Sequence, residues 1–455
     1  MKTINCFVPF ASAEQAKATV EALKASELVK NVYLLKTAEA EGTIEGCEAI
    51  DIKSLYATDT IKKIAEKADA DYVLLYTKYD TLVPGMFAIE RMEKLASDSS
   101  AAMVYADHYQ VVDGKQTNAP VIDYQFGSLR DDFDFGSVLM FNAANYKEAA
   151  AGIDKEYEHA GLYDLRLRIS RLGNLVHINE YLYSDVQQDT RKSGEKIFDY
   201  VDPRNRGRQI EMEQACTEHL KAIGGYLEPK FQEIAFDKGE FEYEASVMIP
   251  VRNRIRTVRD AIKSVLAQKC NFKFNLIIVD NGSTDGTTEA IQEFKDDERL
   301  IHIIPERNDL GIGGCWNLGA HHPKCGKFIV QLDSDDVYKD ENTLQTMVNA
   351  FYEQNCAMVV GTYMMTDFNM NMIAPGIIDH KEWTPDNGRN NALRINGLGA
   401  PRAFYTPVLR DIKVPNTSYG EDYALGLNIS RNYQIGRVYD VVYLCRRWDD
   451  NSDAS

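Results

Sequence analysis

Two carboxylates separated by one residue are the clearest candidate for chemistry in the sequence. Asp333 and Asp335 lie in the run Leu332-Asp333-Ser334-Asp335-Asp336, directly after the apolar stretch 328–331. Hard divalent cations prefer carboxylate oxygens and often complete their coordination shell with substrate phosphates. The spacing therefore predicts a Mg²⁺ or Mn²⁺ site for a phosphorylated substrate. A solvated acidic turn before a helix near Glu341 would produce the same short pattern.

A second polar turn follows another apolar stretch, residues 276–279. It reads Asp280-Asn281-Gly282-Ser283-Thr284-Asp285-Gly286. A carboxylate at the end of a strand can accept a hydrogen bond from a nucleobase NH or a ribose hydroxyl, and glycines allow the chain to turn tightly. The same turn can also cap the next helix through its Ser, Thr or Asp side chains. Both roles can hold at once.

The surrounding pattern predicts the sheet that must position these turns. Short apolar stretches alternate with helical segments such as 258–266, where Val258, Ile262, Val265 and Leu266 form one stripe. This alternation predicts a mainly parallel sheet with helices on both faces. Ligands of such sheets bind beyond the carboxyl ends of the strands. We therefore expect the polar groups that follow the strands to meet on one rim, namely Arg252-Asn253, Asp280-Asn281 and Asp333 to Asp336.

The order of these motifs resembles the family 2 glycosyltransferases over residues 241–452. Ser246 to Asn253 is similar to that family's entry strand with its P-x-x-N type turn, and it is followed by a V-D-x-G-S-x-D turn and a D-x-D motif. The resemblance implies a GT-A fold, with Asp335 as the leading metal ligand and Asp333 facing the ribose or the metal. It also implies nucleotide-sugar contacts from Pro250, Arg252, Asn253, Asp280, Asn281, Asp333, Ser334 and Arg447. Asn281 stands where the family often has a second acid, which leaves the nucleobase open.

Glu421 and Asp422 resemble the family's E-D pair on the acceptor side of the cleft. An inverting transfer needs a base for the acceptor hydroxyl, and a carboxylate can serve when burial or acidic neighbours raise its pKa. The resemblance implies that Asp422 is this base and that Glu421 orients it or the acceptor. Both acids could instead complement the dipole at the first turn of a helix.

Two segments depart from the family's pattern. Asn308 to Gly319 resembles the segment that opens the helix before the D-x-D strand, but Cys315-Trp316 replaces a common alanine and arginine. Trp316 also takes the place of the last glycine of G-x-G-x-x-G, which argues against a dinucleotide-binding loop. The final segment lacks the histidine of the family's R-x-H-x-x-S pattern, which leaves Arg446 or Arg447 to steady a diphosphate, unless this segment is a surface loop.

Composition excludes several functions. The net charge is −18, from 51 basic and 69 acidic residues, which argues against a nucleic-acid partner because such partners require a basic surface. No apolar run reaches the roughly 18 residues of a transmembrane helix, and the first residues do not form a secretory signal. The eight cysteines form no C-x-x-C pair. We therefore expect a cytoplasmic protein, at most peripheral at the inner membrane surface.

The first half repeats the plan of the second in a degenerate form. Ala102-Met103-Val104 matches Ala357-Met358-Val359, and Ile169-Ser170-Arg171 matches Ile429-Ser430-Arg431 in the same order. We therefore predict a glycosyltransferase-like domain over 1–184, a linker with a helix over 185–240, and a catalytic domain over 241–455.

The matching positions of the first half lack the acids. Thr77 and Tyr79 replace the D-x-D carboxylates, while Gly161 and Leu162 replace the E-D pair. We expect this half to bind no metal and to serve stability, homodimerisation or acceptor binding. Asp107, Asp113 and the acids at 131, 132 and 134 keep a second active site conceivable.

These expectations combine into one function. The protein is predicted to have two GT-A-like α/β domains with mainly parallel sheets. It should move a hexosyl group, with inversion, from a nucleotide-diphosphate sugar to a hydroxyl of a glycan or lipid-linked saccharide in polysaccharide biosynthesis. A UDP-sugar is the expected donor, with Mg²⁺ or Mn²⁺. The alternatives are a non-catalytic nucleotide-sugar- or glycan-binding scaffold and a sugar-phosphate nucleotidyltransferase, which would want a glycine-rich loop where residues 251–254 have no glycine.

Overall fold

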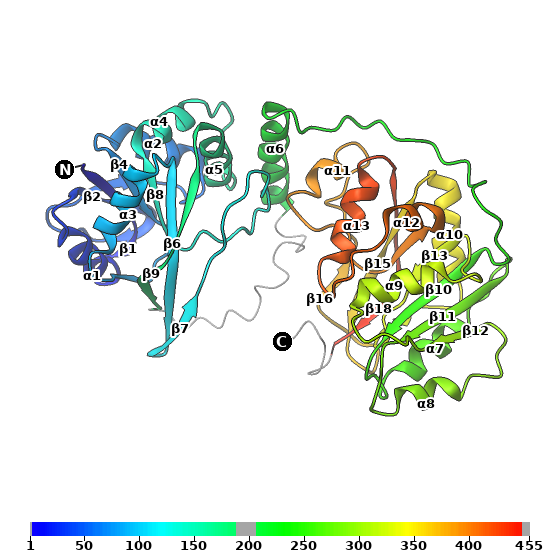
Figure 1. Ribbon diagram of the computed structural model, residues 1–455. Helices are drawn as coiled ribbons and strands as arrows, with labels where there is room; N and C mark the ends of the chain where they lie inside the picture. Colours follow the sequence, from blue (N-terminus) through cyan, green and yellow to red (C-terminus); the bar gives the residue numbers. More distant parts are fainter. Residues whose placement is uncertain (1, 188–205, 448–455) are drawn as a thin grey trace. The chain divides into compact units, whose positions relative to one another are not determined.

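A computed structural model describes residues 2–187 and 206–447, and the chain divides into two compact units, Met1–Tyr226 and Leu227–Ser455 (Figure 1). The boundary between the units falls inside the segment 185–240 that the sequence assigns to a linker. Each unit consists of one mixed sheet with helices, which confirms the prediction of two α/β domains. Within the described ranges, no helix is long and apolar enough to cross a membrane.

The first unit contains a nine-stranded sheet with the order β3-β2-β1-β4-β8-β6-β9-β5 and with β7 paired to β6. Its strands are β1 (Ile4–Ser12), β2 (Val29–Glu41), β3 (Glu48–Asp51), β4 (Tyr72–Tyr76), β5 (Thr81–Pro84), β6 (Met103–Val112), β7 (Lys115–Ala119), β8 (Val138–Asn142) and β9 (Leu175–Val186). Its helices are α1 (Ala13–Lys24), α2 (Thr58–Lys67), α3 (Ala88–Asp98), α4 (Ala143–Ala151), α5 (Gly161–Leu172) and α6 (Arg206–Ala222).

The second unit has a sheet with the order β12-β11-β10-β13-β17-β15-β18-β14 and with β16 paired to β15. Its strands are β10 (Ala245–Val251), β11 (Phe274–Asp280), β12 (Leu300–Ile303), β13 (Phe328–Gln331), β14 (Val337–Tyr338), β15 (Met358–Thr366), β16 (Met372–Ile378), β17 (Arg402–Tyr405) and β18 (Ile435–Arg446). Its helices are α7 (Val258–Leu266), α8 (Thr287–Gln292), α9 (Ile312–His321), α10 (Thr343–Gln354), α11 (Gly388–Asn391), α12 (Thr406–Ile412) and α13 (Glu421–Ser430).

The two sheets have the same topology, strand for strand, as an internal duplication requires. Their registers also agree: Met103 pairs with Leu175 in the first sheet, as Met358 pairs with Ile435 in the second. Strands β8 and β17 run antiparallel to both of their neighbours, so the sheets are mixed. Apolar periodicity detects a buried strand but not its direction, which explains why the sequence did not reveal this reversal.

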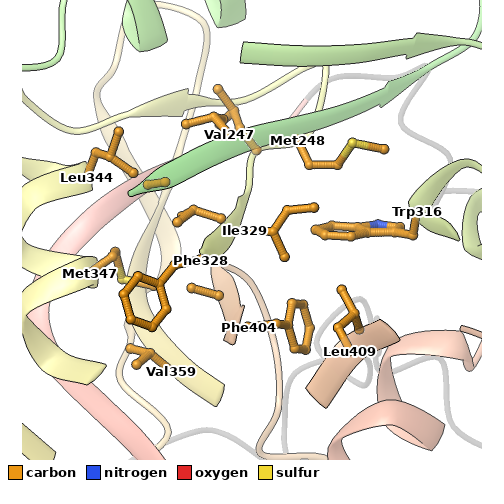
Figure 2. Packing of buried hydrophobic residues seen from close by; sticks show 14 of the residues in the cluster. Val247, Met248, Trp316, Phe328, Ile329, Leu344, Met347, Val359, Phe404 and Leu409 are labelled. Atoms are coloured by element: carbon orange, nitrogen blue, oxygen red, sulfur yellow. The ribbon is translucent and has the colours of Figure 1, made fainter. Parts of the chain in front are cut away.

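Both faces of the second sheet are covered. Successive side chains of a strand point to opposite faces, and Figure 2 shows Leu344 and Met347 of α10 on one side of β10 and β13 and Trp316 of α9 on the other. Phe328 of β13 is completely buried and stacks on Phe351 with a centroid distance of 4.3 Å. This packing fixes β13, the strand that ends at the acidic turn.

We expect Phe328→Ala to destabilise the second unit by about 3 kcal/mol, because it leaves a cavity in a closed core. The three tryptophans, Trp316, Trp383 and Trp448, all lie in the second half. Denaturant titration followed by tryptophan fluorescence therefore reports on this unit. Ile304→Ala, at a side chain that is 55% exposed, is the matched control and should leave the midpoint unchanged. An unchanged midpoint for Phe328→Ala would contradict the packing.

Candidate active site

One cleft of about 590 Å³ in the second unit brings most of the predicted residues together. It opens where β10, β11 and β13 end, as expected for a sheet of this kind. The predicted site residues that line it are Pro250, Arg252, Asn281, Asp333, Ser334, Asp335, Glu421, Asp422 and Arg447. The donor-side and acceptor-side acids therefore share one cavity.

Asp280 and Asn253 are not among the residues that line this cleft. Asp280 is fully buried; one carboxylate oxygen accepts from the Ser283 backbone N–H at 3.2 Å and the other from the Thr288 hydroxyl at 2.5 Å. The Asn253 side-chain oxygen accepts from the Thr284 backbone N–H at 2.8 Å. Asn253 thus joins the two donor-side turns, and Asp280 links its own turn to helix α8. Gly286 is the N-cap residue of that helix, and the Asp285 carboxylate accepts from the Thr287 backbone N–H at 3.0 Å.

Asp333 is held at the end of β13 by two partners from different strands. Its Oδ1 accepts from Gln331 Nε2 at 2.9 Å, and its Oδ2 lies 3.1 Å from the hydroxyl of Tyr443 on β18. The same hydroxyl lies 2.8 Å from Asp336 Oδ2. A tyrosine hydroxyl has one proton and can donate to only one of these carboxylates at a time. The other carboxylate therefore keeps an acceptor atom that a cation could satisfy.

The acidic turn concentrates negative charge in a poorly solvated place. Burial and then the neighbouring Asp335 raise the pKa of Asp333, and burial together with Asp335 and Asp333 raises the pKa of Asp336 well above its usual value. Both causes penalise the charged carboxylate, and a bound cation would remove that penalty. The oxygen donors of Asp333 and Asp335 fit Mg²⁺ or Mn²⁺. Groups of three or more candidate metal ligands are absent from the described residues. Substrate phosphates and water commonly complete the shell of a cation held by two carboxylates.

Arg446, one of the two arginines considered as a contact for a diphosphate, makes its hydrogen bonds to the acidic turn and to helix α7. Its side chain is only 1% exposed; Nε donates to the Asp335 carbonyl at 2.6 Å and Nη1 to Asp260 Oδ2 at 2.8 Å. Arg446 therefore supports the acidic turn and is not among the residues that line the cleft. Arg447 lines the cleft, and Arg254, which the sequence did not single out, lies 3.9 Å from Asp335.

The acceptor-side acids begin helix α13. Gly420, with φ +79°, takes a left-handed conformation that lets the chain enter the helix directly at Glu421. Burial and then Asp422 raise the pKa of Glu421, and its Oε2 atom is buried without a hydrogen-bond partner among the described residues. Asp422 Oδ2 instead accepts a short hydrogen bond from the Arg402 guanidinium. The two neighbouring acids therefore have different surroundings.

The glycines before Trp316 serve close packing. A Cβ added at Gly313 would lie 1.8 Å from the Pro415 carbonyl oxygen, and one at Gly311 would lie 2.6 Å from the Thr417 backbone. These glycines let the chain before α13 approach α9, which fixes the acceptor side of the cleft relative to the donor side. Trp316 itself lines the cleft, where the family commonly has an arginine.

Sequence reasoning did not identify three residues that line or support the cleft: Gln331, Arg402 and Tyr443. Gln331 is the polar last residue of an apolar strand, which is the only local hint of its role. Arg402 lies at the end of a long polar segment, and Tyr443 lies in a strand that was not predicted. Only the pairing of β13 with β17 and of β18 with β14 and β15 brings these residues to the acidic turn.

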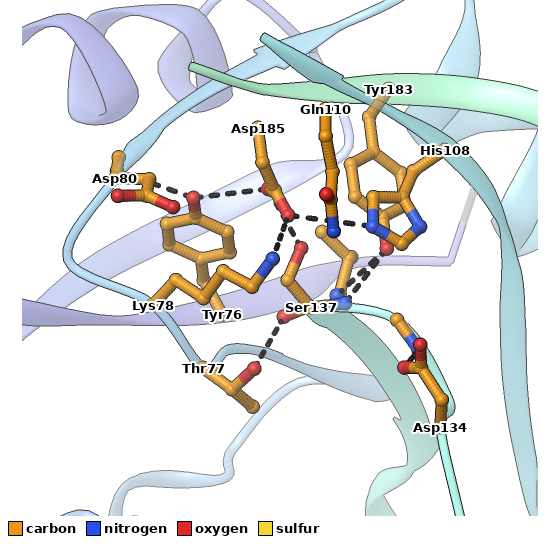
Figure 3. A network of polar contacts seen from close by, with 12 residues as sticks. Tyr76, Thr77, Lys78, Asp80, His108, Gln110, Asp134, Ser137, Tyr183 and Asp185 are labelled. Carbon is orange, nitrogen blue, oxygen red and sulfur yellow. Dashed lines mark hydrogen bonds and ion pairs between the residues drawn. The ribbon is translucent and has the colours of Figure 1, made fainter. Parts of the chain in front are cut away.

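Figure 3 shows what the first unit has at the equivalent place. Asp185 is 2% exposed, and it accepts from Lys78 Nζ at 2.7 Å, the Ser137 hydroxyl at 2.8 Å and the Tyr76 hydroxyl at 3.1 Å. The strand registers place Lys78 at the position of Ser334 and Asp185 at that of Cys445. In the first unit, the Lys78 ammonium group thus neutralises the buried Asp185 carboxylate.

The acceptor-side position of the first unit has no room for an acid. A Cβ added at Gly161, the counterpart of Glu421, would lie 2.5 Å from the Thr58 backbone nitrogen. Asp107, which kept a second site conceivable, accepts from the Val121 backbone N–H at 2.8 Å and lies 2.9 Å from His177 Nε2. It holds the chain that follows β7 against the sheet.

Comparisons with known proteins agree on one family. Residues 246–404 match the model described as glycosyl transferase family 2. An uncharacterized glycosyltransferase of Rickettsia conorii is 40% identical over 111 residues, which are 24% of this chain and 17% of that protein. Glycosyltransferase GlyG of Streptococcus pneumoniae is 29% identical over 122 residues, 27% of this chain and 40% of that protein. The matches span less than half the length of either relative.

Among solved structures, S. aureus TarS 1–349 in complex with UDP-GlcNAc is similar at a TM-score of 0.39 and 20% identity, over 47% of this chain and 61% of that chain. The matched residues 246–404 contain the entry strand, the Asp280 turn and the Asp333–Asp335 pair. The match of residues 246–404 to the glycosyl transferase family 2 model thus confirms the family resemblance that the motif order of the C-terminal half predicts.

Proposed function

We propose that the second unit is a metal-dependent, inverting glycosyltransferase, which moves a sugar from a UDP-sugar to a hydroxyl group of a glycan or lipid-linked saccharide. The observation that carries this proposal is the single cleft shared by Asp333, Asp335, Glu421 and Asp422. Transfer requires an anionic leaving group and an activated hydroxyl on opposite sides of one carbon, and these two pairs of acids are suited to the two tasks.

The donor side of the cleft is suited to a nucleoside diphosphate. Arg252, Arg254 and Arg447 line it and can contact phosphate oxygens, while Asn281 can read a nucleobase edge. Asp333 and Asp335 would hold a divalent cation, which when bound neutralises charge developing on the leaving diphosphate. Asp280 supports this side by linking the turn that begins with it to helix α8.

The acceptor side supplies the base. We assign proton removal from the acceptor hydroxyl to Asp422, and orientation of the acceptor to Glu421, which lines the cleft beside it. A positioned carboxylate contributes roughly 10²- to 10⁴-fold to such a step. Because attack and departure occur on opposite faces of the sugar, the anomeric configuration is inverted.

The first unit takes no part in catalysis in this proposal. Thr77 and Tyr79 stand in place of the metal-binding acids, Lys78 between them is paired with Asp185, and Gly161 replaces the acceptor-side acid. The roles left to it are stability, homodimerisation or binding of the acceptor.

Thermal shift of the full chain with UDP, GDP, ADP and CDP, each with and without Mn²⁺, tests the donor class. We expect the largest stabilisation with UDP plus Mn²⁺. A saturating ligand at 100 times its dissociation constant stabilises the native state by about 2.7 kcal/mol. The UDP-sugars that stabilise the protein are then tested for release of UDP. If no nucleotide stabilises the chain in a metal-dependent way, the scaffold alternative replaces the enzyme.

A further inference from the structure

A chain of polar contacts crosses the floor of the cleft from the acceptor side to the donor side. Arg402, at the start of β17, donates to Asp422 Oδ2 through Nη2 and to Gln331 Oε1 through Nη1 at 3.0 Å. The Arg402 backbone N–H also lies 3.2 Å from the same Gln331 oxygen. Gln331 Nε2 then donates to Asp333 Oδ1 at 2.9 Å. The acceptor-side and donor-side acids are thereby joined through only two residues.

The geometry of Arg402 is fixed by three elements. Its Nε donates to the Leu398 carbonyl at 2.6 Å, which leaves the two terminal nitrogens for Asp422 and Gln331. The side chains of Arg402 and Asp422 are only 14% and 26% exposed, so this ion pair is poorly screened. A planar guanidinium can satisfy such fixed partners simultaneously, whereas a lysine ammonium on a flexible stem cannot reproduce the fork.

We propose that Arg402 is a positioning residue, which holds the Asp422 carboxylate for the acceptor hydroxyl and, through Gln331, fixes it relative to Asp333. This inference rests on the proposed function, because it assigns Asp422 the role of base. It goes beyond that function by identifying Arg402 as the residue that positions the Asp422 carboxylate. Gln331 is the connecting element, because both of its amide atoms are engaged.

The test uses the full chain, Mn²⁺ and the UDP-sugar that gives the fastest release of UDP. We expect Arg402→Met to lower kcat by about 10²-fold, in the range of a lost positioning contact. UDP affinity, measured by calorimetry with Mn²⁺, should stay within about threefold, because the lost contact acts on the transition state and not on bound UDP. Arg402→Lys should recover only part of kcat, because an ammonium group cannot make the same fork of hydrogen bonds. Arg307→Met, at an exposed arginine, is the control.

A double-substitution cycle shows whether Arg402 acts through Asp422. In an Asp422→Asn background, Arg402→Met should cost less than about threefold in kcat, because residues that act as a unit are not additive. An undiminished 10²-fold loss in that background would overturn the proposal, and so would a wild-type kcat for Arg402→Met. Loss of UDP affinity equal to the loss of kcat would also overturn it. If the wild-type protein releases UDP from no sugar donor, the proposed function fails first, which is a distinguishable result.

Discussion

Asp335→Asn is expected to lower UDP release from the best UDP-sugar by about 10³-fold or more and to abolish the stabilisation by Mn²⁺ and UDP together. The substitution keeps the size of the side chain and removes the charge that a divalent cation requires. Stabilisation of the leaving diphosphate by a bound cation is worth several kcal/mol, and about 4 kcal/mol corresponds to that factor in rate. Initial rates and calorimetric titration of UDP with and without Mn²⁺ measure both effects.

The same variant tests the first unit. In the first unit, Thr77 and Tyr79 stand where the D-x-D acids would be, and Asp185 is engaged in an ion pair with Lys78. We therefore expect one Mn²⁺ per wild-type chain in the presence of UDP and none in the variant. Asp340→Asn is the matched control, since Asp340 is exposed after β14 and outside the cleft; it should behave like the wild type. Substantial residual UDP release in Asp335→Asn would show that the first unit is active.

Asp422→Asn is expected to lower kcat by about 10³-fold while the affinity for UDP and Mn²⁺ stays within about threefold. The amide cannot accept the proton of the acceptor hydroxyl, and general-base contributions reach roughly 10²- to 10⁴-fold. An interaction made only in the transition state changes kcat and leaves ground-state binding intact. Water can serve as the acceptor, so release of UDP is measured without a saccharide acceptor and then with candidate glycans.

Two further variants separate the roles of the neighbouring acids. Glu421→Gln should lose less activity than Asp422→Asn if Glu421 orients the acceptor, because a glutamine can still hydrogen-bond a hydroxyl. Asp411→Asn, at an exposed carboxylate on α12, should retain wild-type rates. If Glu421→Gln instead loses more activity than Asp422→Asn, the base is Glu421, whose pKa is already raised by burial and by Asp422.

The strand and turn pattern predicted much of the fold and the donor-side turns. Apolar stretches of four to seven residues followed by polar turns identified β10, β11 and β13, because a strand covered on both faces must be continuously apolar. The partly buried edge strand β12 was recognised from its Leu and Ile residues. The same periodicity could not show that β17 runs antiparallel between β13 and β15. That reversal brings Arg402 to the acidic turn, and no local pattern encodes it.

What the sequence determined by itself was the order of motifs, and with it the family and the acids Asp333, Asp335, Glu421 and Asp422. These residues are adjacent to strand or helix ends, so short-range patterns suffice to find them. Only the tertiary structure decided which of them line one cleft, that Asp280 is engaged by its own turn and by residues of α8 and β12, and that Arg446 supports the acidic turn. Those outcomes depend on contacts between residues from 3 to 186 positions apart. The partner of a buried charge is set by which strands the fold places side by side.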